Sequence, residues 1–164
     1  MLKAVNQWCF PDQTPLEQVF DVSRKAGLDA VELNLYMPGS VGLTMETTAA
    51  EAEAIGAKAR EYGLQLRSLS TGLLWQFPLC SPDADVRAKG REVVRKQIDL
   101  ASLMGMDTVL VVPGVVNPQI SYDECYRRSQ DELAQLAPYA EEKGVHIGIE
   151  NVWNKFLLSP LEMA

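Results

Sequence analysis

Runs of apolar and β-branched residues divide the chain into short segments separated by longer amphipathic ones. One short segment, from Val109 to Val112, is apolar throughout, as expected for a strand that is buried on both faces. In the longer segments the apolar residues recur every three or four positions, which is typical of a helix with one buried face. The pattern predicts strands at residues 3–9, 30–36, 65–70, 108–112 and 146–150, and helices at residues 15–26, 49–62, 82–104 and 122–143.

Recurring signals mark where the predicted helices end and begin. Gly27, Gly63, Gly105 and Gly144 each precede an apolar residue, a polar residue and a predicted strand. Glycine readily adopts the left-handed conformation that closes many helices, so these positions predict helix C-termini. A Ser or Thr followed three residues later by Glu, the sequence form of a capping box, occurs at residues 14–17, 48–51, 121–124 and 159–162. The run Ser81-Pro82-Asp83 predicts one more helix start, with proline at the first helical position.

The strict alternation of strands and helices predicts an α/β fold with a parallel sheet. The predicted helix-to-strand connections are short, whereas the strand-to-helix connections at residues 37–47, 71–80, 113–120 and 151–158 are long. This asymmetry favours a (β/α) barrel, in which functional residues lie at the C-terminal ends of the strands. A doubly wound sheet has the same alternation and is the alternative. However, the first strand runs into Trp8-Cys9-Phe10-Pro11 and not into a glycine-rich phosphate-binding turn.

The length of the chain changes this picture. An eight-stranded barrel needs about 250 residues, and the chain has 164. Its last capping box, at residues 159–162, announces a helix just before the final residue. We therefore expect residues 1–164 to form one incomplete barrel domain with five strands and four complete helices, lacking strands six to eight. The alternative is a complete flavodoxin-like domain with a frayed tail. In the incomplete barrel, unpaired strands at both sheet edges would favour a homo-oligomer.

Composition excludes several classes of protein. The formal net charge of −7 argues against a general nucleic-acid binder, which needs a basic surface. The longest apolar run is far shorter than the ~20 residues of a membrane-spanning helix, and we expect no signal peptide, since Met1-Leu2-Lys3 leads directly into an alternating segment. Cys9, Cys80 and Cys125 are too widely spaced for a zinc motif, and we expect small buried side chains in a cytoplasmic protein.

Carboxylates at two predicted strands are candidates for chemistry. Glu150 closes an apolar strand at the end where barrel sites lie, and a carboxylate there needs a cation or a substrate proton as partner. The alternative is a Glu paired with a neighbouring basic group. His146, four residues earlier on the same face, is expected to be a packing or hydrogen-bonded interior residue. Glu32 should face the interior, where it either pairs with a basic residue such as Arg67 or belongs to the site.

All three tryptophans fall in the long loops that should share one end of the barrel. Trp8, Trp75 and Trp153 could form the aromatic walls of a small-ligand pocket, or the loops could simply pack on one another. Lys155 is the strong cation of the last of these loops and could meet an anionic group of a substrate or be solvated.

Four segments together resemble a known family. They are residues 31–33 (VEL), 70–75 (STGLLW), 108–116 (TVLVVPGVV) and above all 148–162 (GIENVWNKFLLSPLE). The chain resembles bacterial proteins of the xylose-isomerase-like barrel superfamily, in particular sugar-phosphate isomerases and epimerases of the hexulose-6-phosphate isomerase-like and L-xylulose-5-phosphate 3-epimerase-like kinds. The resemblance covers the whole chain.

The resemblance implies a (β/α)8 barrel with one divalent cation, Mn, Mg, Co or Zn. In relatives, the Glu that matches Glu150 is a metal ligand and one of two acid/base carboxylates that act on a ketose or sugar phosphate through an enediolate. The residues expected to contact the sugar are Trp8, Asn34, Tyr36, Ser70, Trp75, Trp153 and Lys155. The abasic-site endonuclease branch and xylose isomerase proper use early histidines, and His146 is the only histidine.

The remaining family ligands, an Asp, a His and the second Glu, belong to strands six to eight, which this sequence lacks. One Glu cannot hold a catalytic cation with useful geometry. We therefore expect this chain alone to be inactive as an isomerase. The alternative is a non-catalytic half-barrel that binds a sugar or self-assembles.

Overall fold

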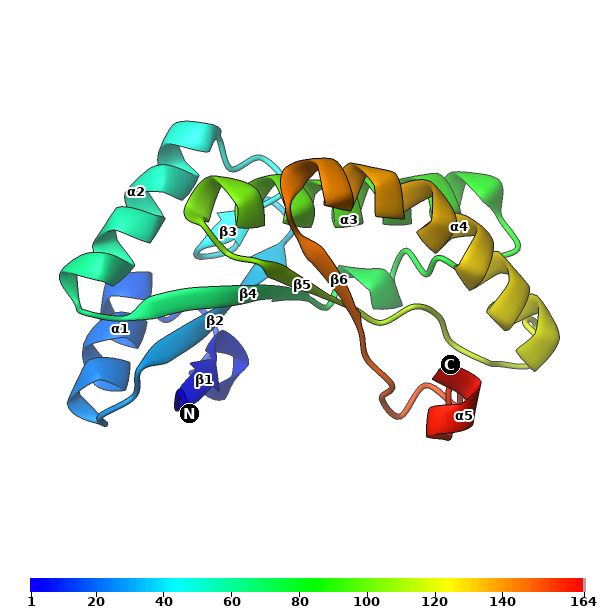
Figure 1. The fold of residues 1–164 in the computed structure, drawn as a ribbon, viewed down its shortest axis with the longest axis horizontal. Coiled ribbons are helices and arrows are strands. Elements are labelled where there is room, and N and C mark those ends of the chain that lie inside the picture. Colours follow the sequence, from blue (N-terminus) through cyan, green and yellow to red (C-terminus); the bar gives the residue numbers. More distant parts are fainter. Residues whose placement is uncertain (164) are drawn as a thin grey trace.

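The computed structural model describes residues 1–163 as one parallel sheet flanked by helices (Figure 1). The strands are β1 (Ala4–Asn6), β2 (Ala30–Tyr36), β3 (Leu43–Thr44), β4 (Gln65–Thr71), β5 (Thr108–Val111) and β6 (His146–Ile149). The helices are α1 (Leu16–Lys25), α2 (Ala49–Glu61), α3 (Ala84–Met104), α4 (Tyr122–Lys143) and α5 (Pro160–Met163), with 3-10 turns η1 (Gln7–Cys9) and η2 (Leu73–Trp75). The sheet order is β1-β2-β4-β5-β6, with every strand pair parallel, and β3 pairs with β2 beyond the end of β1.

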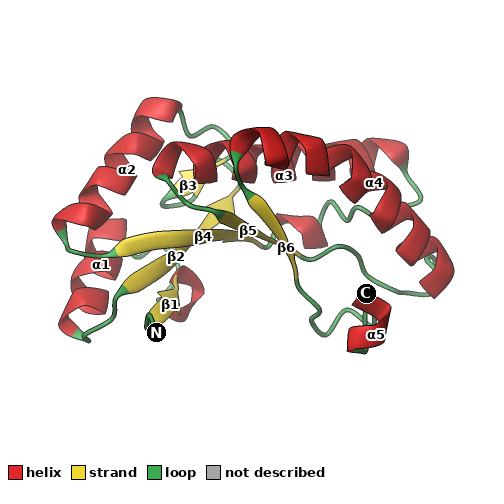
Figure 2. Ribbon diagram, viewed as in Figure 1, coloured by secondary structure: helices red, strands yellow, loops and turns green. Residues whose placement is uncertain are grey.

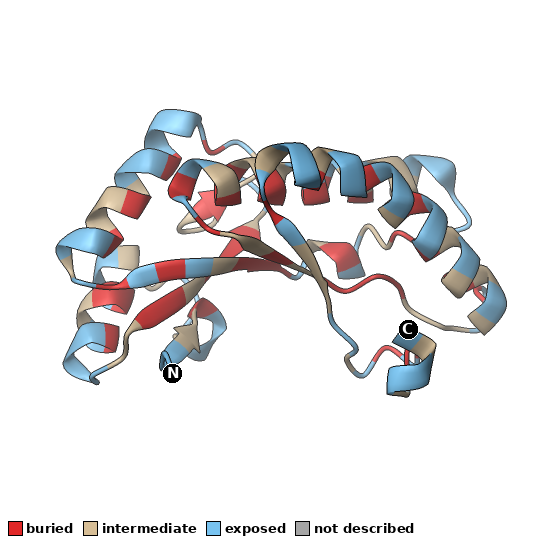
Figure 3. Ribbon diagram, viewed as in Figure 1, coloured by how far each residue is buried: buried red, intermediate tan, exposed pale blue. Residues whose placement is uncertain are grey.

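The main apolar core of the sheet lies on one face. In Figures 1 and 2, α2, α3 and α4 form a row along one side of the strands, and the opposite, concave side carries none of these three helices. Val31, Leu33 and Leu35 of β2 are at most 1% exposed and belong to the main apolar core with Val109 and Val111 of β5. Figure 3 shows the same division, with buried segments concentrated between the strands and the helices. We call the helix-covered side the outer face and the concave side the inner face.

The predicted partial (β/α) barrel is confirmed, with differences at the ends of elements. The first strand was expected at residues 3–9, but it ends at Asn6 and continues as η1. The cause is local: the Asn6 side-chain oxygen accepts a hydrogen bond from Trp8 N at 2.7 Å and turns the chain. The two-residue β3 is an additional element, too short to produce a periodic pattern. The four-residue α5 lies where the last capping box predicts a helix to begin.

The four glycines predicted to end helices all adopt the left-handed conformation. Their φ angles lie between 67° and 75° at Gly27, Gly63, Gly105 and Gly144. Each glycine leads within a few residues into the next strand, as the short helix-to-strand connections predicted.

Two of the four predicted capping boxes are confirmed. Thr48 with Glu51 and Ser121 with Glu124 make both reciprocal hydrogen bonds. The box at residue 14 is wrong: Pro15 precedes α1, and the Thr14 hydroxyl donates to Pro11 O at 2.6 Å.

At the third long helix and at α5 the start also differs from the prediction. The helix α3 begins at Ala84 with Asp83 as its cap, two residues later than Pro82. At α5, Glu162 accepts from Leu158 N at 2.7 Å and from the Ser159 hydroxyl at 3.3 Å, so the glutamate and not the serine supplies the accepting oxygen.

A β-bulge in β4 decides which of its side chains face inward. Val31 pairs with Leu66 and Leu33 with Leu69, so β4 has one more residue than β2 between these pairs. Leu66 and Leu69 both reach the outer core, although simple alternation would place them on opposite faces. The extra residue turns Ser68 to the inner face, where it meets Glu32.

The cysteines only partly follow the expectation of small buried side chains. Cys80 and Cys125 are fully buried, but Cys9 is exposed because it lies in η1 at the rim of the sheet. Among residues 1–163, no helix is both long and apolar enough to cross a membrane.

A buried carboxylate ties α3 to α4. Glu132 is 4% exposed, and its two oxygens accept from Arg87 Nε at 2.9 Å and from Arg91 Nη1. A buried charge of this kind is tolerated only while it is paired.

We expect Glu132→Ala to lower the free energy of unfolding by about 3 kcal/mol, since it leaves two partly buried guanidinium groups without their partner. Urea denaturation followed by circular dichroism measures the change. Glu141→Ala, at an exposed position of the same helix, is the control and should change the free energy by less than about 0.5 kcal/mol. Equal effects of the two substitutions would contradict the assignment.

The capping box of α2 should make stability depend on pH. Hydrogen bonds from the backbone N–H and the hydroxyl of Thr48 hold the pKa of Glu51 below its usual value. A carboxyl whose pKa is lowered by folding stabilises the folded state above its unfolded pKa of about 4.3, and this contribution is lost as the pH falls through the lower, folded value. Glu51→Gln should therefore lower Tm at pH 7 and have a smaller effect near pH 3. Thermal melts of this variant and of Glu53→Gln, exposed in the same helix, test this; a Tm difference independent of pH would refute it.

Candidate functional site

The C-terminal ends of the parallel strands bring the three tryptophans onto one rim. Trp8 lies in η1 after β1, Trp75 in η2 after β4, and Trp153 in the segment after β6. The rings of Trp75 and Trp153 are stacked, with centroids 4.9 Å apart and planes at 25°. The Trp8 ring lies beside Gly72, the residue that precedes η2. Trp8, Trp75 and Trp153 remain 51%, 39% and 86% exposed, so each ring keeps surface accessible to a ligand, although the stacked faces of Trp75 and Trp153 cover each other.

Below this rim, the inner face carries a connected set of polar side chains. Asn6 Nδ2 lies 2.5 Å from Glu32 Oε2, 3.2 Å from Asn34 Oδ1 and 3.0 Å from Ser70 Oγ. The Ser68 hydroxyl donates to the other oxygen of Glu32 at 2.6 Å. One amide thus links three strands, because β2 lies between β1 and β4 and pairs Asn6 with Glu32 on one side and Asn34 with Ser70 on the other.

Asn34 connects this network to the rim. It is fully buried, and its side-chain amide lies within hydrogen-bond distance of the Asn6 side chain (3.0 Å), of the Tyr36 hydroxyl (3.3 Å) and of the Ser70 hydroxyl. Tyr36 is only partly buried. The predicted residues Asn34, Tyr36 and Ser70 therefore lie together, and Asn34 and Ser70 position their neighbours from inside the sheet.

Glu32 faces inward as predicted, but the first of its two predicted alternatives, an ion pair with Arg67, is wrong. Arg67 forms an exposed ion pair with Asp107 at 2.5 Å instead. Glu32 takes its hydrogen bonds from Asn6 and Ser68, both neutral. Neither Asn6 nor Ser68 was selected from the sequence. Asn6 could have been selected because it is a polar residue at the C-terminal end of a strand. The inward orientation of Ser68 depends on the bulge in β4, which the sequence pattern does not reveal.

The residues of the last strand lie apart from this network. Glu150 follows β6 directly and is exposed; its backbone N–H donates to Val111 O at 3.1 Å. Within residues 1–163 its carboxylate makes no hydrogen bond or ion pair. Lys155 is likewise exposed, with a left-handed φ of 59°. His146, expected to be packed or hydrogen-bonded in the interior, is exposed because β6 is the last strand of the sheet and pairs only with β5 among the described strands.

The described residues do not form a metal centre by themselves. Residues 1–163 contain no group of three or more His, Cys, Asp or Glu side chains placed to hold an ion. Glu150 stands alone at its position, so a cation there would need donors beyond the described residues.

Two cysteines pack beneath the rim loops. Cys80 Sγ accepts a hydrogen bond from Val115 N at 3.2 Å. A hydrogen bond with the Cys125 thiol, the largest influence, lowers the pKa of Cys80 to about 7 and raises that of Cys125. Gly114 makes room for the pair, since a Cβ there would lie 2.6 Å from Cys125 Sγ and 3.0 Å from Cys80 Sγ. The contact holds the loop after β4 against that after β5.

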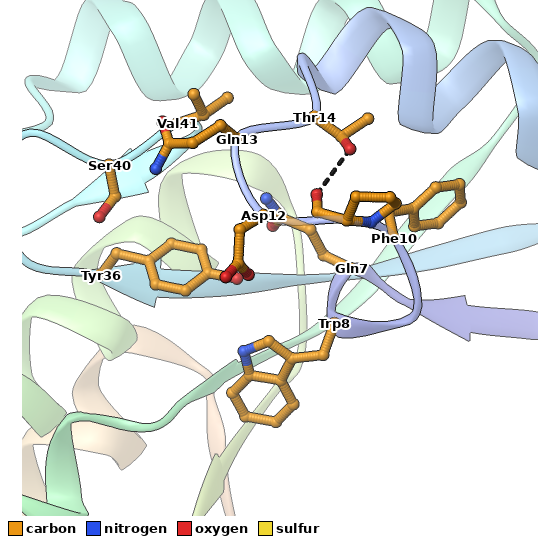
Figure 4. A pocket seen from close by; sticks show the side chains of 10 residues that line it. Gln7, Trp8, Phe10, Asp12, Gln13, Thr14, Tyr36, Ser40 and Val41 are labelled. Atoms are coloured by element: carbon orange, nitrogen blue, oxygen red, sulfur yellow. Dashed lines mark hydrogen bonds between the residues drawn. The ribbon is translucent and has the colours of Figure 1, made fainter.

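A pocket of about 270 Å³ opens between the loops that follow β1 and β2 (Figure 4). Its walls include the predicted residues Trp8 and Tyr36. They also include Gln7, Asp12, Gln13 and Ser40, which sequence reasoning did not select. Polar residues in loops are too common to single these out before their positions are known.

Comparisons with known proteins agree with this architecture. Residues 20–164 match the family described as xylose isomerase-like TIM barrel. A curated relative, L-ribulose-5-phosphate 3-epimerase UlaE from Escherichia coli, is 26% identical over 129 residues, which are 79% of this chain and 45% of the relative. The chain thus spans about half the length of the curated relatives it matches.

Solved structures show the same fold. A D-tagatose 3-epimerase-like protein superposes with a TM-score of 0.79 at 17% identity, covering 99% of this chain and 58% of the other. L-ribulose 3-epimerase gives a TM-score of 0.76 at 22% identity, covering 92% and 50%. D-psicose 3-epimerase, solved in the presence of D-fructose, gives 0.74 at 18% identity, covering 93% and 53%. At these identities the likeness concerns the fold, and the match over residues 20–164 shows the family: the chain belongs to the xylose isomerase-like TIM barrels.

Proposed function

We propose that this chain is the N-terminal part of a barrel that isomerises or epimerises a ketose or a sugar phosphate. The observation that carries the proposal is the position of Glu150, a free carboxylate at the C-terminal end of a parallel strand, at the same end of the sheet as the aromatic rim. The names of its relatives, epimerases of L-ribulose 5-phosphate, L-ribulose and D-psicose, support the same class of reaction.

The chemistry assigned to Glu150 is proton transfer at the carbon next to a carbonyl. Its exposed carboxylate can accept that proton, and an enediolate results. A second carboxylate on the opposite face of the sugar would give an epimer, whereas return of the proton to the adjacent carbon would give the isomeric aldose or ketose. Glu32 is not proposed as this second carboxylate, because both of its oxygens already accept hydrogen bonds from Asn6 and Ser68.

The proposal includes substrate contacts from the rim. Trp8, Trp75 and Trp153 offer ring faces to the C–H surface of a sugar, and Lys155 offers a charge to an anionic group. Asn34 and Ser70 act from below by holding Tyr36, which borders the pocket.

A divalent cation, Mn, Mg, Co or Zn, with Glu150 as one ligand, is the cofactor that the family resemblance implies. Such an ion would polarise neighbouring sugar oxygens. Since the described residues supply only Glu150 at this position, the chain by itself is proposed to be inactive or nearly so. A cytoplasmic location is also proposed, supported by three cysteines that are all free thiols.

Glu150→Gln tests the proposal. The assay uses the longer barrel protein of which this chain is proposed to be the N-terminal part. It is incubated with L-ribulose 5-phosphate and with L-ribulose in D₂O containing Mn²⁺, and NMR follows deuterium incorporation beside the carbonyl. Where the wild-type protein exchanges the proton, the variant should be at least about 100-fold slower, since it cannot accept a proton. Glu142→Gln, exposed on α4, is the matched control and should exchange at the wild-type rate. An unchanged rate in Glu150→Gln would remove Glu150 from the reaction.

A non-catalytic half-barrel that self-assembles is the second candidate. Among the described strands, β1 and β6 each pair on one edge only, and the inner face is uncovered by the long helices. Exposed edges and an open sheet favour association of identical chains.

Sedimentation velocity at micromolar concentrations tests this candidate. We expect a dimer or larger species whose share rises with concentration. The substitution Gly148→Lys places a charge on β6 and should shift the distribution to the monomer if β6 is the contact edge. The site has room for it, since an added Cβ would lie 3.4 Å from Thr108 Cγ2. A stable monomer at every concentration would contradict self-assembly.

A further inference from the structure

The pocket between the loops after β1 and β2 has features beyond the roles assigned to Trp8 and Tyr36. Figure 4 shows side chains from both loops converging on it, with Asp12, Gln13 and Ser40 around Tyr36. Its volume of about 270 Å³ is near the lower end of the range for small-molecule sites, about 300–1,000 Å³. It therefore suits one small molecule or one end of a longer one.

One wall of the pocket is a fixed turn. Thr14 N and the Thr14 hydroxyl both donate to Pro11 O, at 3.2 and 2.6 Å, and close residues 11–14. Gln13, at the tip, has a φ of 65°, a left-handed conformation that is unfavourable for a residue other than glycine. The turn thereby holds Asp12 and Gln13 in place at the pocket without a ligand.

Gln7 is a pre-oriented hydrogen-bond donor in the same pocket. Its side chain is 7% exposed, and its oxygen accepts from Asn34 N at 3.1 Å. This bond fixes the amide, whose nitrogen has no hydrogen-bond partner among residues 1–163. Gly42 leaves space beside it, since a Cβ there would lie 3.3 Å from Gln7 Nε2. Gln7 Nε2 is not among the fully buried unpaired atoms of the described residues, so it faces solvent at the pocket, where a water or a ligand can accept its hydrogen bond.

The charge of the pocket selects against phosphate. Asp12 is the one lining residue that is charged at neutral pH, and none of the lining residues is Lys, Arg or His. The first turn of α1, which follows the pocket wall, adds another acidic residue, Glu17. Phosphate groups are bound by Arg, Lys or unopposed helix N-termini, whereas hydroxyl groups are bound by carboxylates and amides.

We propose that this pocket binds the neutral, hydroxyl-bearing end of a ketose and excludes a phosphate at that end. The Gln7 amide donates to a sugar hydroxyl, the Asp12 carboxylate accepts from a neighbouring hydroxyl, and the Trp8 ring borders the carbon chain. This assignment rests on the proposed function, which leaves open whether the substrate is phosphorylated, and it favours the free sugar.

The test uses the full chain, labelled with ¹⁵N, and two probes, L-ribulose and L-ribulose 5-phosphate. NMR titration follows the side-chain amide of Gln7 and the indole N–H of Trp8. We expect L-ribulose to shift both signals and to bind at least tenfold more tightly than its phosphate, because the phosphate meets Asp12. Asp12→Lys should reverse this order, and Asp12→Asn should bring the two affinities within about threefold of each other. Asp123→Asn, at an exposed position of α4 outside the pocket, should leave the ratio unchanged.

The outcomes separate this assignment from the proposed function. Tighter binding of the phosphate to the wild-type chain, an affinity ratio indifferent to Asp12, or no shift at Gln7 with either probe would overturn the pocket assignment, even if Glu150-dependent proton exchange is observed. Conversely, an Asp12-dependent preference for L-ribulose, together with an exchange rate of the longer barrel protein that Glu150→Gln leaves unchanged, would retain the pocket and refute the catalytic role of Glu150.

Discussion

Burial of the outer face of a parallel sheet under its crossover helices is the interaction on which the rest of this structure depends. Parallel strands cannot be joined by tight turns, so each strand needs a helix to return the chain, and each helix needs an apolar surface to cover. Leu33, Leu69 and Val109, from three neighbouring strands, are fully buried in that layer. Once the helices occupy this face, the loops that leave the strands must all emerge at one end, and the aromatic rim follows from that arrangement.

The inner face obeys a different rule, because polar groups there have one another as partners. Asn6, Glu32, Asn34, Ser68 and Ser70 satisfy most of their hydrogen-bonding capacity within three adjacent strands. Such a network is stable only when all its members are correctly placed, so it fixes the relative positions of β1, β2 and β4. The same network reaches Gln7 through the backbone of Asn34 and Tyr36 through its side chain, and it thereby sets the shape of the pocket above.

The sequence allowed the fold to be predicted in more detail than the site. Apolar periodicity and the glycines at positions 27, 63, 105 and 144 located every long helix and the order of the main strands, because those signals arise from local geometry and burial. Predictions that required knowledge of neighbours were less successful. Arg67 pairs with Asp107 and not with Glu32, and His146 is exposed. Partner choice among charged groups depends on strand register, and the burial of a residue on the last strand depends on what lies beside it; neither is encoded in the local pattern.

The bulge in β4 has a consequence for comparing relatives within the family. The extra residue between Leu66 and Leu69 interrupts the alternation of side chains between the two faces of the sheet. The face on which a residue after the bulge lies therefore cannot be inferred from the alternation before it. In a relative without the extra residue, the hydroxyl that donates to the equivalent of Glu32 would have to stand one position away in the strand sequence to face inward. Two members could therefore share the same inner surface while an ungapped alignment of this strand pairs core residues of one with site residues of the other.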